Sequence, residues 1–137
     1  MPDASRPSVL VVEDDIAIRT TMCAAFTAAG FFTHQADTIG AAMKILGERR
    51  VDAVTLDLGL PNPLRLERPG LKLLSFLRSS AEHERAPVLV FTGLPPSEAD
   101  EAFLLQHGAH IMQKPQPYTV LIDWLISALR DRDASPT

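Results

Sequence analysis

The stretch Val9-Leu-Val-Val-Glu-Asp-Asp15 decides the fold, because a short, continuously apolar run ends abruptly in three acids. Such a run is typical of a strand that is covered on both faces, as in a parallel sheet. In an open parallel sheet, ligands bind at the edge formed by the carboxyl ends of the strands. We therefore expect Glu13 and Asp14 to lie at a functional edge, with Asp15 capping the helix that follows.

Polar side chains end three further apolar runs along the chain. They are Asp57 at the end of Val54-Thr-Leu-Asp57, Thr92 in Phe91-Thr-Gly93, and Lys114 in Gln113-Lys-Pro115. The carboxyl ends of parallel strands meet at one edge of their sheet. We therefore expect these side chains to form one active site with the acids that follow the first strand.

Strand-length apolar runs alternate with stretches of helical periodicity throughout the chain. The predicted strands are residues 8–12, 31–35, 52–57, 87–92 and 109–113, and the predicted helix boundaries are Gly30, Thr38, Gly70, Ser97 and Gly108. This alternation predicts an α/β fold: a doubly wound, flavodoxin-like parallel sheet of five strands in the order 2-1-3-4-5, with five helices. We expect a single domain over 1–137, with a core at about 8–130 and a flexible tail at 131–137.

The amino-acid composition excludes several classes of function for this chain. The chain has 137 residues, of which 46% are apolar, and its net charge of -4 gives no basic surface for direct nucleic-acid binding. Cys23 is the only cysteine, so an internal disulfide is excluded, and the four histidines lack metal-ligand spacing and are expected at the surface or in turns. No apolar run approaches the ~20 residues that span a bilayer, and no secretory signal is present, so we expect a cytoplasmic protein.

Three converging carboxylates would repel one another. Two unit charges ~4 Å apart cost about 4 kcal/mol at an effective dielectric of ~20, so Glu13, Asp14 and Asp57 predict a bound cation, for which Mg²⁺ is the best match. Asp57 is the natural nucleophile, because aspartyl phosphate is an established covalent intermediate. Lys114 and Thr92 would then bind the oxygens of a phosphoryl group.

These motifs, in this order, resemble the receiver domain of bacterial two-component response regulators, typified by the chemotaxis response regulator. The resemblance rests on Val9 to Asp15, Leu56 to Pro61, Phe91 to Gly93 and Lys114-Pro115, and it covers the chain from Val9 to about Leu129. It implies Mg²⁺-dependent phosphoryl transfer to Asp57 from a sensor histidine kinase, a phosphotransfer protein or a small phosphodonor. The module would not be an enzyme beyond its own phosphorylation and dephosphorylation, and it would act on a downstream protein target.

The resemblance also implies residue roles. Glu13, Asp14, Asp57 and the backbone carbonyl of Gly59 would hold the metal, Thr92 would be the switch hydroxyl, and Lys114 would be the phosphate-binding lysine before a cis peptide bond at Pro115. Members of this family often form homodimers through the fourth helix, fifth strand and fifth helix, so a homodimer is one arrangement for this chain.

Two departures from the family pattern stand beside the site. Ile111 occupies the position, three residues before Lys114, where the family usually has an aromatic residue that relays the signal, and a shortened 108–114 segment places His110 next to it. The segment 62–69 after the predicted phosphoacceptor strand is longer than usual. We expect it to shape access for the kinase or for attacking water.

Other functions fit less well. A haloacid-dehalogenase-type hydrolase needs a second acid two residues after the nucleophile, where Gly59 stands, and a dinucleotide-binding domain needs a glycine-rich turn after the first strand. A receiver-fold scaffold or phosphate sink with little phosphorylation-dependent relay stays open, favoured by Ile111. Whether the chain is a stand-alone receiver or part of a longer protein also stays open.

Overall fold

The computed structural model describes residues 6–60 and 69–134. Its five strands are β1 (Ser8–Val12), β2 (Phe32–Ala36), β3 (Ala53–Leu56), β4 (Val88–Thr92) and β5 (Ala109–Gln113). Its five helices are α1 (Ile16–Ala28), α2 (Ile39–Glu48), α3 (Pro69–Ser79), α4 (Glu98–Gln106) and α5 (Tyr118–Ala134). All neighbouring strands pair in parallel in the order β2-β1-β3-β4-β5, which confirms the predicted class and strand order.

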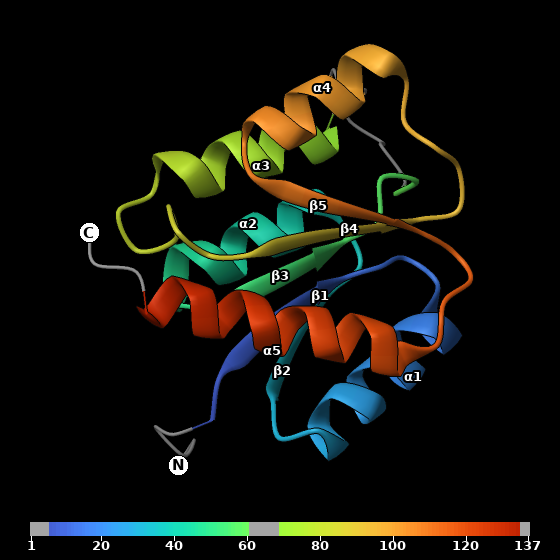
Figure 1. Ribbon diagram of the computed structural model, residues 1–137, viewed down its shortest axis with the longest axis vertical. Coiled ribbons are helices and arrows are strands. Elements are labelled where there is room, and N and C mark those ends of the chain that lie inside the picture. Colours follow the sequence, from blue (N-terminus) through green and yellow to red (C-terminus); the bar gives the residue numbers. More distant parts are fainter. Residues whose placement is uncertain (1–5, 61–68, 135–137) are drawn as a thin grey trace.

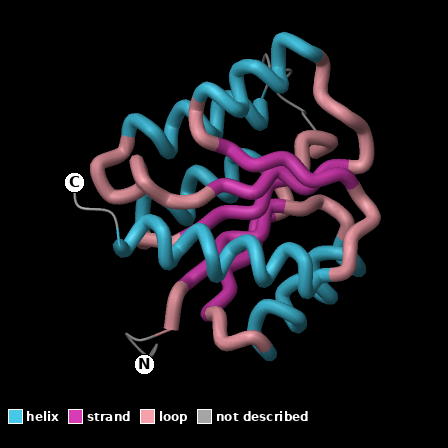
Figure 2. The backbone as a smooth tube through the Cα atoms, in the orientation of Figure 1, coloured by secondary structure: helices cyan, strands magenta, loops and turns pink. Residues whose placement is uncertain are grey.

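The sheet lies between two layers of helices, with α1 and α5 on one face and α2, α3 and α4 on the other (Figures 1 and 2). The continuous apolar run in β1 is explained by this arrangement. Val9 and Val11 belong to the cluster under α1 and α5, while Leu10 and Val12 belong to the cluster under α2, α3 and α4. Strands buried on both faces leave only their ends available for polar chemistry.

The helix ends agree with the predicted boundaries. Asp15 caps α1, its side chain accepting a hydrogen bond from the Ile18 N–H at 3.0 Å, and Thr38 and Ser97 cap α2 and α4 in the same way. Gly30 follows α1 with a φ of 101°, a left-handed conformation in which glycine avoids the Cβ clash of other residues. These signals fix where α1, α2 and α4 begin and where α1 ends.

The fifth helix extends further than the sequence indicates. It runs to Ala134, so the first residues of the expected tail are helical, and residues 135–137 lie outside the described ranges. The Arg132 guanidinium donates to the Asp52 carbonyl at 3.1 Å and to its carboxylate at 3.4 Å, which ties the end of α5 to the start of β3. Residues 61–68, most of the segment expected to shape access, also lie outside the described ranges.

His83 lies in a turn, one of the two places expected for the histidines, but it is not exposed. It sits in the turn before β4 and is buried. The Val51 N–H donates to its Nε2 at 3.1 Å, so the proton of the neutral ring is on Nδ1, which lies 3.2 Å from Ser80 Oγ. The ring therefore joins the end of α3 to the segment that leads into β3.

Across residues 6–60 and 69–134, every helix lacks the length or the apolar character that crossing a bilayer requires.

Candidate functional site

The three predicted metal acids meet at the carboxyl ends of β1 and β3, the edge toward which the strand arrows point in Figure 1. The ladder between these strands continues past them, because the Asp57 N–H donates to the Val12 carbonyl at 3.1 Å. One carboxylate oxygen each from Glu13, Asp14 and Asp57 lies within 4.8 Å of the others. Adjacency of β1 and β3 thus brings together acids that are more than forty residues apart in the sequence.

Lys114, just after β5, links two of these acids. Its Nζ donates to Glu13 Oε1 at 2.6 Å and to Asp57 Oδ2 at 3.3 Å, and it lies 5.6 Å from the centre of the Phe91 ring. The other oxygen of Asp57, Oδ1, accepts the Gly59 N–H at 3.0 Å. The Lys114–Pro115 peptide bond is cis, as the family resemblance implies.

The carboxylates of Glu13 and Asp57 differ in their pKa values. Glu13 is 2% exposed, and burial, reinforced by Asp57, raises its pKa to about 7 against the effect of Lys114. Burial also acts to raise the pKa of Asp57, but hydrogen bonds from Glu13, the Gly59 N–H and Lys114 outweigh it and hold the pKa below its ordinary value. Asp57 is therefore ionised at neutral pH, while Glu13 carries a proton part of the time.

Thr92 and Gly59 complete a cleft beside the acids. This cleft has a volume of about 480 Å³ and is lined by Asp57, Leu58, Gly59, Thr92, Gly93, Leu94, Pro95, Pro96, Ser97, Asp100 and Lys114. Thr92 is the last residue of β4, and its carbonyl accepts the Lys114 N–H at 2.9 Å, which fixes the ends of β4 and β5 together. The structure thus gathers the predicted nucleophile, hydroxyl and ammonium around one space.

The donor set fits a hard divalent cation. Carboxylate oxygens are the ligands that Mg²⁺ prefers, and the exposed Asp14 leaves room for the waters that Mg²⁺ retains. Lys114 is the only cationic side chain that hydrogen-bonds any of the three carboxylates among the described residues. It offsets only part of their charge. A cation beside Asp57 is therefore electrostatically favourable.

The position of the usual aromatic residue is aliphatic here. Ile111 is partly buried and packs against the apolar cluster under α3 and α4. His110 is exposed on the other side of β5 and stacks on Trp124 of α5, with ring centres 5.0 Å apart and ring planes 10° apart. The aromatic group beside the predicted switch position therefore faces α5 rather than α4.

Arg19 contacts the site, a contact that sequence reasoning missed. Its Nη1 donates to the Glu13 backbone carbonyl at 2.8 Å, and its Nε donates to Gln35 Oε1 at 3.1 Å. A contact between a side chain and a backbone carbonyl leaves no pattern in the residue types, so no sequence signal marks it.

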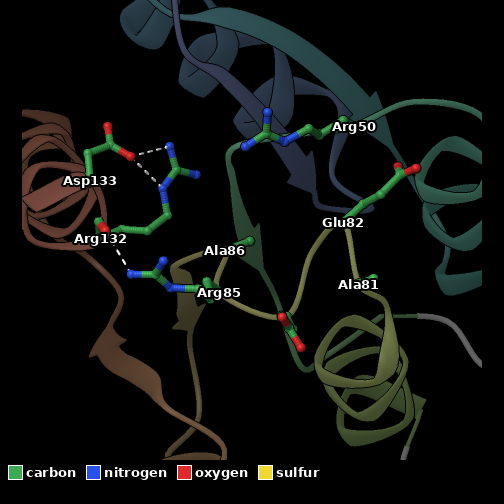
Figure 3. Close-up of a pocket in the computed structure, with 8 residues that line it drawn as sticks. Arg50, Ala81, Glu82, Arg85, Ala86, Arg132 and Asp133 are labelled. Atoms are coloured by element: carbon green, nitrogen blue, oxygen red, sulfur yellow. Dashed lines mark hydrogen bonds and ion pairs between the residues drawn. The ribbon is translucent and has the colours of Figure 1, made fainter. Parts of the chain in front are cut away.

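A second hollow lies at the opposite end of the sheet (Figure 3), and its charges are balanced. The Arg85 guanidinium donates to the Arg132 carbonyl at 2.8 Å, and Arg132 pairs with Asp133 at 2.9 Å. Three arginines and three acids line it, so it has no excess charge to attract an ion: Arg50, Glu82, Glu84, Arg85, Arg132 and Asp133. The clustered carboxylates and Lys114 lie instead beside the cleft at Asp57.

Solved structures share the fold. A CheY-like response regulator receiver domain protein from Methanospirillum hungatei superposes with a TM-score of 0.83 at 22% identity, over 94% of this chain and 98% of that chain. The receiver domain of the sensor histidine kinase PA1611 from Pseudomonas aeruginosa, which has a magnesium ion coordinated in its active-site cleft, superposes with a TM-score of 0.76 at 22% identity. That match covers 92% of this chain and 99% of that one.

Sequence relatives give the family. The KDP operon transcriptional regulatory protein KdpE of Escherichia coli is 30% identical over 129 residues, which are 93% of this chain and 53% of KdpE. The aerobic respiration control protein ArcA of E. coli is 34% identical over 75% of this chain and 40% of ArcA, so the chain spans about half the length of these relatives or less. The model of the response regulator receiver domain matches residues 9–125. With that match covering most of its length, the chain belongs to the response regulator receiver domains of two-component signalling.

Proposed function

We propose that this chain is a phosphoacceptor module in which Asp57 takes a phosphoryl group from a phosphohistidine of a sensor kinase or phosphotransfer protein. The observation that carries the proposal is the environment of Asp57. Its carboxylate is kept ionised in a largely buried site next to the Lys114 ammonium, and Lys114 and Thr92 line the same cleft. An ionised carboxylate with cationic and hydroxyl donors beside it is what phosphoryl capture requires.

The transfer is a nucleophilic substitution at phosphorus. An oxygen of the Asp57 carboxylate forms a new P–O bond while the P–N bond to the donor histidine breaks. The electron pair of the broken bond stays on the imidazole nitrogen, which is then free to take a proton. Lys114 would exchange its contact with Asp57 for one with a phosphoryl oxygen, and the Thr92 hydroxyl would donate to another oxygen.

Glu13, Asp14 and Asp57, with the backbone carbonyl of Gly59, are the groups that would hold Mg²⁺. When bound, the ion neutralises charge on the phosphoryl oxygens during transfer. The protein's own part is to keep three hard oxygen donors converging within one small region at the end of the sheet. The partial protonation of Glu13 would be lost on metal binding, because cations favour ionised carboxylates.

The consequence of phosphorylation would be a changed protein-binding surface. A phosphoryl group adds about -1.5 to -2 charge next to the ends of β4 and β5, which Thr92 and Lys114 connect. A downstream protein target, or a second copy of the chain, would read that change. The receiver-fold scaffold or phosphate sink is the second candidate, and Ile111 at the usual aromatic position is the observation that favours it.

Incubation with acetyl phosphate and Mg²⁺, followed by intact mass measurement, tests the proposal. The wild-type chain should gain a single phosphoryl group, and Asp57→Asn or addition of EDTA should abolish the gain. Asp133→Asn, which changes an exposed aspartate at the far end of α5, is the matched control and should react as the wild type does. No gain in the wild type, or a gain that survives Asp57→Asn, would refute the proposal.

Partner binding separates the two candidates. A pull-down from the source cell lysate, with and without the phosphoryl mimic beryllium fluoride, should recover a protein in only one of the two states if phosphorylation is relayed. Equal recovery of the same partner in both states, from a chain that is phosphorylated at Asp57, would instead support the phosphate sink.

A further inference from the structure

One arginine joins three segments around the acidic turn after β1. Arg19 lies in the first turns of α1, and its backbone N–H donates to the Asp15 carbonyl at 2.8 Å. From there its guanidinium reaches the Glu13 carbonyl at 2.8 Å and the Gln35 side chain of β2 at 3.1 Å. A guanidinium presents several N–H donors in a fixed plane, so it can hold both acceptors at once.

The contact to Glu13 fixes a particular peptide group. This is the peptide between Glu13 and Asp14, whose carbonyl accepts from Arg19 and whose N–H donates to Glu13 Oε2 at 3.1 Å. The preceding N–H, that of Glu13, donates to the Ala36 carbonyl at 3.0 Å. Because a peptide is planar, rotating this one would break the hydrogen bonds at its two ends together. Its orientation sets the directions of both acidic side chains.

We propose that Arg19 is a positioning residue for divalent-cation binding, acting through the Glu13–Asp14 peptide. The inference rests on the proposed function, in which these two acids hold Mg²⁺. Within the described part of the chain, the Arg19 guanidinium hydrogen-bonds none of the three carboxylates; it donates to a backbone carbonyl and to a neutral amide. It therefore supports the site through geometry, as groups behind the ligands do in many metal sites.

The sign of its effect separates positioning from simple electrostatics. A guanidinium near a cation site repels the cation, so removal of its charge alone would strengthen Mg²⁺ binding. Loss of a fixed peptide orientation would weaken binding instead. Arg19→Met removes both the charge and the hydrogen bonds, whereas Arg19→Lys keeps the charge but cannot reproduce the two-acceptor contact.

Calorimetric titration with Mg²⁺ is the test, without any phosphodonor. We expect Arg19→Met and Arg19→Lys each to weaken Mg²⁺ binding by at least about tenfold, the lower end of the usual effect of such supporting groups. Gln35→Met, which removes only the second anchor of the guanidinium, should give a smaller loss. Arg50→Met is the matched control, because Arg50 is an exposed arginine at the opposite end of the sheet, and it should bind as the wild type does.

A second readout excludes a merely structural effect. Urea unfolding in EDTA should show each variant folded, and at saturating Mg²⁺ the Arg19→Met chain should regain most of the wild-type rate of phosphorylation by acetyl phosphate. Unchanged or tighter Mg²⁺ binding by folded Arg19→Met would overturn the positioning role alone. A wild-type chain that binds no Mg²⁺ would overturn the metal part of the proposed function, and this inference with it.

Discussion

Thr55 is a buried polar residue whose replacement should stabilise the protein. It lies in β3, two residues before Asp57, and is 1% exposed. Its Oγ1 is the only fully buried side-chain nitrogen or oxygen without a hydrogen-bond partner among residues 6–60 and 69–134. A hydroxyl buried in this way loses its bonds to water and gains none in the fold, which costs about 1–3 kcal/mol.

Thr55→Val removes that cost while it keeps the shape of the side chain. We expect the free energy of unfolding to rise by about 1 kcal/mol, the lower end of this range, because packing against the new methyl group is not optimised. An unfolding entropy of ~2.1 cal/mol/K per residue gives about 0.29 kcal/mol/K for 137 residues. The melting temperature should therefore rise by about 3 °C.

Urea and thermal unfolding, followed by circular dichroism, measure the change. Thr33→Val is the matched control: Thr33 is also a strand threonine, but it is only partly buried and its hydroxyl is not left buried without a partner. It should give no stabilisation. If Thr55→Val leaves stability unchanged or lowers it, the hydroxyl has a partner in solution and the reasoning fails.

Two further predictions concern charge. Lys114→Met removes the ammonium that contacts Glu13 and Asp57. Phosphorylation by acetyl phosphate should therefore slow by about a hundredfold, the usual effect of losing one charge-stabilising donor. A time course of intact mass measures the rate. Burial lowers the pKa of His83 below its ordinary value near 6.5, so the unfolded chain binds more protons in acid. This contribution to stability is complete at pH 7 and is lost as pH falls below about 6.5, by at most about 1.4 kcal/mol per pH unit. The urea midpoints of the wild type and of His83→Gln, measured at pH 7 and below pH 6.5, check this. If acid lowers the midpoint of both proteins equally, the prediction is wrong.

The strand order and the site could be predicted because they depend on short stretches of sequence. A continuous apolar run followed by acids, as at Val9 to Asp15, indicates both a doubly covered strand and its ligand-binding end. Once the five strands are recognised, parallel pairing predicts that their carboxyl ends meet at one edge of the sheet. This prediction needs no knowledge of side-chain contacts. Asp57, Thr92 and Lys114 were found in this way, and all three line one cleft.

Other features depend on contacts that residue types do not reveal. Arg132 holds the end of α5 to Asp52, eighty residues earlier in the chain. The helix therefore continues to Ala134, into the polar stretch that was expected to be a flexible tail. His83 lies in a turn as expected, but nothing in the sequence indicated that it is buried, with its two ring nitrogens at Val51 and Ser80. Arg19 binds a backbone carbonyl, and every residue in a protein has one.

The division of roles between Glu13 and Asp57 shows most clearly what the fold adds to the sequence. Both are carboxylic acids at strand ends, and their ordinary pKa values differ little. Each carboxylate accepts a backbone N–H at one oxygen and Lys114 at the other, so these contacts do not separate them. Glu13 lies deeper, and burial, reinforced by Asp57, raises its pKa to about 7, whereas the pKa of Asp57 stays below its ordinary value. A proton shared by the two therefore rests on Glu13, and Asp57 stays ionised. Two titratable groups with pKa values pushed apart in this way take different chemical roles, which favours Asp57, rather than Glu13, as the nucleophile.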